Sequence, residues 1–112
     1  MEFTSKSLGP VEVVTLNGAI EGNEGQILRE GLSRQIADGR TRLLLDLTSV
    51  DFIDSSGLSA LIGTLKATRR LGGNLGLLNP APTVRSVLEL TRLHRVLDIF
   101  STECEGVAKL AG

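Results

Sequence analysis

Residues 43 to 58 read Leu-Leu-Leu-Asp-Leu-Thr-Ser-Val-Asp-Phe-Ile-Asp-Ser-Ser-Gly-Leu. The leucine run at 43 to 47, which is interrupted only by Asp46, is too short for a helix and is typical of a strand buried on both faces. The segment Asp54-Ser55-Ser56-Gly57 then stands immediately ahead of a helical pattern, where capping residues are expected. The stretch therefore predicts a central strand, a tight loop and a helix in series.

The helix after this loop is predicted over residues 56 to 71. Apolar residues recur at three- and four-residue steps from Leu58 to Leu65, while Lys66 and the arginines that follow lie on the opposite side. Gly72-Gly73 predicts its end, because glycine readily takes the left-handed conformation of a helix C-terminus. Ser55 and Ser56 are thereby placed at a helix start, where unpaired backbone N–H groups favour an anion such as a phosphate.

Four segments of the chain carry a likeness to a known family. They are Leu45-Asp46-Leu47, Phe52-Ile53-Asp54-Ser55-Ser56-Gly57-Leu58, Gly72-Gly73 and Leu88-Glu89-Leu90-Thr91-Arg92-Leu93. Together they resemble the bacterial anti-sigma factor antagonists, whose domain type, STAS, is shared with sulfate transporters, and the likeness extends over nearly the whole chain. The resemblance implies that Ser55, directly after the aspartate, is the phosphoacceptor, with Ser56 as the second choice.

The resemblance also implies a regulatory role without enzymatic activity. In the family scheme, the dephosphorylated form binds a serine-kinase anti-sigma factor of the GHKL ATPase type, and phosphorylation at Ser55 releases it. A PP2C-type phosphatase restores the binding form. The chain itself then needs no cofactor, because the ATP belongs to the kinase. The alternative is a non-switching STAS subunit, for example of a lipid-transport ATPase, in which the serine is only a helix cap.

The partner surface is expected where two strand-to-helix loops meet at one end of the sheet. It comprises the 54 to 59 loop with its helix start, the Glu21 to Asn23 loop and the outer face of the helix. The expected contacts are Glu21, Gly22, Asn23, Asp54, Ser56, Gly57, Ser59 and Lys66. Two departures from the family pattern fall here: Gly18-Ala19-Ile20-Glu21 replaces the common Gly-Glu-Leu/Ile-Asp, and Ser59 replaces a common glycine.

Composition limits the classes of partner. A chain of 112 residues predicts a single domain, and the resemblance implies that it is a STAS domain over 1–112. The net charge of -1 gives no electrostatic argument for binding nucleic acid or an anionic membrane. Aromatic residues make up 3% of the chain, with no Trp or Tyr, so the usual side chains for stacking on bases are missing. One cysteine excludes a disulfide framework, and no signal peptide or apolar span is evident. We expect a cytoplasmic protein with protein partners that is a monomer when unbound.

The remaining pattern predicts an α/β fold: a small mixed, mostly parallel sheet with an N-terminal antiparallel hairpin and about four helices. Periodicity alone leaves a flavodoxin-like layout open, whereas the resemblance implies the STAS fold, with helices mainly on one side. The strands are expected at 2–7, 11–16, 42–47, 75–78 and 96–100. The other helices are expected from Asn23 to Asp38, from Pro80 or Pro82 through Leu93, and over 102–110.

Catalysis and metal binding are the competing interpretations of the polar residues. A serine with His94 and a carboxylate suggests a hydrolase, but the Gly-x-Ser-x-Gly elbow is absent, and His94 stands at a helix end, where surface histidines are common. Asp46, Asp51 and Asp54 suggest a Mg²⁺ site. However, Asp46 interrupts the strand and can bond loop backbone, and Asp51 and Asp54 belong to a turn, where such bonds are expected. We therefore expect no catalytic residue and no metal.

Overall fold

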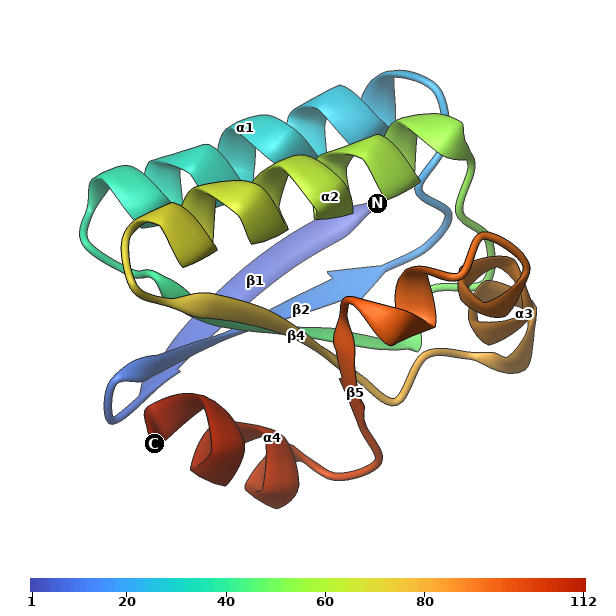
Figure 1. The fold of residues 1–112 in the computed structure, drawn as a ribbon. Coiled ribbons are helices and arrows are strands. Elements are labelled where there is room, and N and C mark those ends of the chain that lie inside the picture. The colour runs from blue at the N-terminus through green and yellow to red at the C-terminus, as the bar shows by residue number, and fades with distance from the viewer.

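The computed structural model describes all 112 residues and shows a five-stranded sheet with strands in the order β1-β2-β3-β4-β5 (Figure 1). β1 and β2 form an antiparallel hairpin, and every other neighbouring pair is parallel. The predicted α/β fold is confirmed. The elements are β1 Glu2–Leu8, β2 Val11–Asn17, α1 Asn23–Ala37, β3 Arg42–Ser49, α2 Ser55–Arg70, β4 Asn74–Leu78, α3 Pro82–Leu90, a 3-10 turn Leu93–Arg95, β5 Asp98–Phe100 and α4 Glu103–Ala111.

The helices lie mainly on one face because the strand order never reverses. Right-handed crossovers between successive parallel strands all place their helix on the same side, and α1, α2 and α3 all contribute to one cluster of 18 buried residues. Only α4 covers the opposite face, over a smaller cluster of five (Figure 1). β3 supplies leucines alternately to both clusters, which confirms that it is a strand buried on both faces.

The start of α1 differs from the prediction. The pattern predicts Asn23 as the N-cap and Gln26 as the partner in a capping box, whereas Gly22 is the cap residue and makes no side-chain cap bond. Gln26 instead donates to Glu30, one turn along the helix. Gly22 has a φ of 59°, which glycine adopts without strain, and its N–H is bound by a residue distant in sequence.

The end of α3 also differs. The apolar spacing predicts a helix through Leu93, but α3 ends at Leu90, and Leu93 begins the 3-10 turn. The helix is interrupted at Arg92, which adopts a left-handed conformation with a φ of 61°. Glycine is the residue usually found in this conformation after a helix, so the sequence gives no sign of the break. β5 is correspondingly shorter than predicted and begins at Asp98. No helix combines the length and the apolar composition needed to cross a bilayer.

Candidate functional site

The site is built on two loops that pair with each other beyond the ends of their strands. The Ile20 N–H donates to the Phe52 carbonyl at 2.9 Å, and the Asp54 N–H donates to the Ile20 carbonyl at 3.1 Å. Ile20 and Ile53 form a parallel bridge, and both side chains are buried in the main core. The loop before α1 and the loop before α2 therefore form one hydrogen-bonded unit, which Ile20 and Ile53 anchor in the core.

Asp54 joins this unit to the starts of both helices. Its Oδ1 accepts the N–H groups of Ser56 and Gly57, at 2.9 and 3.1 Å, and thereby caps α2. Its Oδ2 accepts the Gly22 N–H at 2.8 Å, immediately before α1. One carboxylate thus fixes the N-terminus of α2 against that of α1, where the Glu24 and Gly25 N–H groups donate to the Glu21 and Gly22 carbonyls.

These bonds favour the ionised form of Asp54. The hydroxyl of Ser56 and the backbone N–H of Gly22, with smaller help from the N–H groups of Gly57 and Ser56, lower the Asp54 pKa from 3.8 to about 2. The carboxylate is therefore charged throughout the physiological range. Its negative charge is a fixed feature of the site.

The lowered pKa predicts an acid-dependent loss of stability. Because the folded state binds this proton more weakly than the unfolded state, the stabilisation from Asp54 is complete above about pH 5 and is lost as the pH falls from about 4 through about 2. Urea unfolding at pH 7 and pH 3 should show a smaller loss on acidification for Asp54→Asn than for the native chain. Asp51→Asn is the control, since the Asp51 carboxylate is exposed. Equal losses for Asp54→Asn and the native chain would contradict the assigned role.

The two adjacent serines differ in the exposure and hydrogen bonding of their hydroxyls. Ser56 Oγ lies 2.5 Å from Asp54 Oδ1 and 3.1 Å from the Gly22 carbonyl oxygen, so its hydroxyl proton is occupied within the site. Ser55 is exposed at the first position of α2, and none of the side-chain hydrogen bonds involves its hydroxyl. Of these two serines, only Ser55 offers a free hydroxyl to another protein.

Two glycines allow the helices to approach this closely. A Cβ on Gly25 of α1 would lie 2.4 Å from Ser56 Oγ and 2.6 Å from the Ser56 carbonyl carbon. A Cβ on Gly57 would lie 2.5 Å from a side-chain carbon of Ile53. Gly25 is a residue of the site that the sequence interpretation missed, although a glycine inside a helical pattern is a recognised sign of close packing.

The structure brings most of the expected partner contacts to one surface. Glu21, Gly22, Asn23 and Ser59 are exposed around the joined loops, and Lys66 is exposed farther along α2. Gly57 is buried, so it supports the loop instead of presenting a contact. Phe52 was missed: its apolar character suggests a core position, yet 46% of it is exposed, just ahead of Asp54.

The structure also places the other polar residues. Asp46 Oδ1 accepts the N–H and the hydroxyl of Thr48, which agrees with the expectation that Asp46 bonds nearby backbone. His94 lies in the 3-10 turn, with Nδ1 3.4 Å from the Leu88 carbonyl oxygen. No group of three potential metal ligands is present. None of the three surface hollows is lined by residues 52 to 59, so the serine loop is presented on an open surface.

Known proteins resemble this chain in sequence and in fold. A family model described as STAS domain matches residues 3–106. The anti-sigma-B factor antagonist of Bacillus subtilis is 32% identical over 83% of this chain and 84% of its own length. Among solved structures, TM1081 of Thermotoga maritima gives a TM-score of 0.93 at 25% identity, covering 98% of this chain and 95% of that one.

A further structural relative is SpoIIAA of Bacillus in its phosphorylated form, with a TM-score of 0.75 and 25% identity over 96% of this chain and 98% of that one. The curated relative is named for antagonism of an anti-sigma factor, which agrees with the expectation of a regulatory protein and not an enzyme. The match over residues 3–106 and the shared fold show that this chain belongs to the STAS domain family.

Proposed function

We propose that this chain is a cytoplasmic anti-sigma factor antagonist that acts by partner switching. Its dephosphorylated form binds and sequesters a serine-kinase anti-sigma factor of the GHKL type, and phosphorylation of Ser55 by that kinase ends the complex. A PP2C-type phosphatase removes the phosphate. The whole chain acts as one STAS domain and is a monomer when unbound.

The observation that carries this proposal is the contrast between the two serines. A kinase must bring the acceptor oxygen in line with the γ-phosphate of ATP, which requires a hydroxyl that is exposed and not already bonded. Ser55 meets both conditions, whereas the Ser56 hydroxyl bonds Asp54 and Gly22. The paired loops hold Ser55 in a fixed position, which lowers the entropic cost of binding a partner.

The surface around Ser55 suits a protein partner. It is an open surface without a hollow, and exposed Phe52 offers an aromatic side chain of the kind that often dominates binding energy. Polar residues surround it, from Glu21, Gly22 and Asn23 on one loop to Ser56 and Ser59 on the other. We propose that these residues form the kinase contact, with Lys66 at its edge, where a charge chiefly affects association rate.

A phosphate on Ser55 would find little stabilisation within the chain. The sequence predicts unpaired N–H groups at this helix start that could bind an anion. In the structure, the N–H groups of Ser56 and Gly57 already bond the Asp54 carboxylate. The phosphate would therefore stand in solvent beside a second negative charge. In that position the kinase would have to enclose an unpaired charge, and the phosphate would be accessible to a phosphatase.

The relatives support the proposal in two ways. The Bacillus subtilis protein is named an anti-sigma-B factor antagonist, and SpoIIAA is known in both unphosphorylated and phosphorylated forms. A regulator of this kind works where sigma factors are, so we place it in the cytoplasm.

Co-expression with a GHKL-type kinase encoded beside it tests the proposal. Intact mass should show one phosphate, and fragmentation should place it on Ser55. Ser55→Ala should accept none and should stay bound to the kinase in the presence of ATP. Ser86→Ala is the control, because Ser86 is an exposed serine of α3 outside the proposed contact, and it should be phosphorylated like the native chain.

Two outcomes would overturn parts of this proposal. Stoichiometric phosphorylation of Ser55→Ala would transfer the acceptor role to Ser56. A native chain that neither binds the kinase nor accepts phosphate would favour the alternative, a non-switching STAS subunit whose Ser55 only begins a helix.

A further inference from the structure

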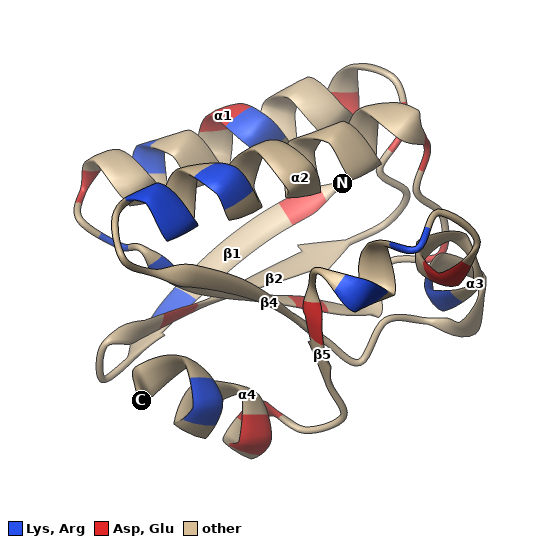
Figure 2. Ribbon diagram, viewed as in Figure 1, with Lys and Arg blue, Asp and Glu red and all other residues tan.

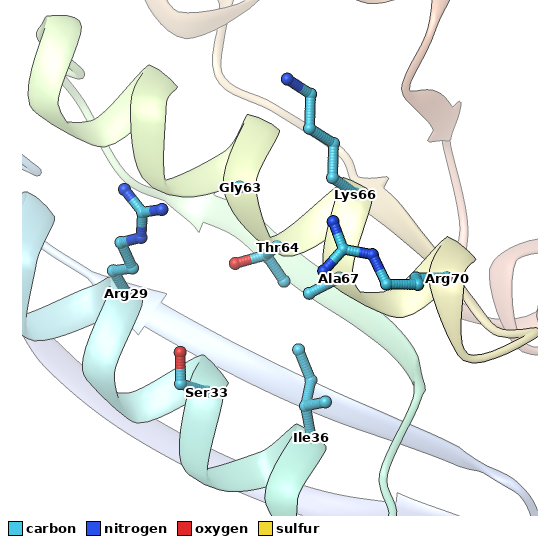
Figure 3. Close-up of a pocket in the computed structure, with 8 residues that line it drawn as sticks. All are labelled: Arg29, Ser33, Ile36, Gly63, Thr64, Lys66, Ala67 and Arg70. Carbon is cyan, nitrogen blue, oxygen red and sulfur yellow. The ribbon is translucent and has the colours of Figure 1, made fainter.

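A groove of about 280 Å³ runs between α1 and α2, away from the serine loop (Figure 3). Helix α1 contributes Arg29 and Ser33, and α2 contributes Gly63, Thr64, Lys66 and Arg70. Gly63 is eight residues beyond Ser55, which corresponds to about 12 Å along a helix. The groove is therefore separate from the proposed phosphorylation site.

The groove collects positive charge without compensation. Three of its lining residues are cations and none is a carboxylate. Arg29, Lys66 and Arg70 form no ion pair within the chain, whose four ion pairs involve the N-terminus, Lys6 and Arg40. α2 carries no acidic residue at all. The blue segments of its last turns mark its cations (Figure 2). An unbalanced cluster of this kind favours an anion.

Thr64 supplies a second and independent indication. Only 4% of this residue is exposed, yet its hydroxyl takes no part in the side-chain hydrogen bonds of the protein. Thr68, one turn later, satisfies its hydroxyl on the Leu65 carbonyl at 3.0 Å. The Thr64 hydroxyl instead points into the groove (Figure 3). A hydroxyl that opens into the groove and has no partner within the chain is available to bond a ligand there.

Arg29 is positioned by the absence of a side chain on α2. A Cβ at Gly63 would lie 3.0 Å from Arg29 Nη2, so the guanidinium lies directly over the backbone of α2. The long side chain thereby spans from one helix to the other. Gly63 is exposed enough that a methyl group would displace Arg29 without disturbing the core.

We propose that the α1–α2 groove is a binding site for a small free phosphate anion with at least two negative charges. Guanidinium groups match the geometry of phosphate oxygens, and the Thr64 and Ser33 hydroxyls supply further donors. The volume is at the small end for ligand sites, and no aromatic residue lines it, which favours a compact anion over a nucleoside. This site does not depend on the proposed partner switching.

Inorganic pyrophosphate is the probe. Titration at constant ionic strength should produce saturable amide shifts confined to residues 29–36 and 63–70. Arg70→Ala should weaken binding about tenfold. Thr64→Val and Gly63→Ala should each weaken it several-fold although neither changes the net charge. Thr64→Val removes the hydroxyl that opens into the groove, and Gly63→Ala displaces Arg29.

Two controls separate the site from general attraction to cations. Arg85→Ala, which removes an exposed cation on α3, should bind pyrophosphate like the native chain, and so should Ser55→Ala. Unsaturable shifts at many surface cations, or equal affinity for Thr64→Val, Gly63→Ala and the native chain, would overturn the proposal. Absence of any pyrophosphate binding would also overturn it and leave the groove as a surface for an acidic protein.

Discussion

Replacing Gly25 by alanine should lower the free energy of unfolding by about 2 kcal/mol, although alanine is the better helix former by about 1 kcal/mol. The reason is the contact between α1 and α2, where the new Cβ would lie 2.6 Å from the Ser56 carbonyl carbon. Backbone cannot rotate away as a flexible side chain can, so the helices must separate. Thermal unfolding should occur roughly 10 °C lower.

Gly63→Ala is the matched control, since it makes the same substitution in the other helix of the pair. There the new Cβ would meet only the mobile end of Arg29. The gain in helix propensity should leave stability unchanged or slightly higher. Equal destabilisation by both substitutions would show that the Gly25 contact is not what limits the approach of the helices.

The central strand and the serine loop could be predicted because their signals are local. A leucine run of strand length and an aspartate two residues before a helical pattern each act through neighbours in the chain. The structure accordingly places β3 at the centre and begins α2 at Ser55, although the cap of α2 is Asp54 and not one of the serines. The alternation of helices with strands predicted a mostly parallel sheet, whereas the strand order stayed open, because periodicity alone also fits a flavodoxin-like layout.

What could not be predicted depends on contacts between distant residues. The N-cap of α1 is Gly22 and not Asn23, and the Gly22 N–H is bound by Asp54, 32 residues away. The groove likewise requires Arg29 and Arg70 on separate helices whose spacing the sequence does not state. Phe52 looks like a core residue by type, and only the folded loop shows its exposure.

Phosphorylation of Ser55 should weaken binding to the kinase by at least about 30-fold. An unpaired charge enclosed in an interface costs roughly 2–5 kcal/mol, and 2 kcal/mol already corresponds to that factor. Asp54 increases the effect, because its lowered pKa keeps a second negative charge beside the phosphate. Calorimetric titration of the kinase with both forms measures the difference, with Ser55→Asp expected to bind weakly as well. If the affinities of the phosphorylated and unphosphorylated forms for the kinase differed by less than threefold, this prediction would be wrong.

The same phosphate should leave the fold intact. Repulsion between exposed charges is reduced by salt, and helix-end charge effects of about 0.3–1 kcal/mol are small beside the roughly 5–15 kcal/mol that stabilises a domain. The added negative charge should raise the pKa of Asp54 above about 2, which carboxyl chemical shifts can follow. Amide shifts should change around residues 20–22 and 54–60 only. Changes through β4 and β5 would instead show a conformational switch across the sheet, and release of the kinase would then not be a local event at Ser55.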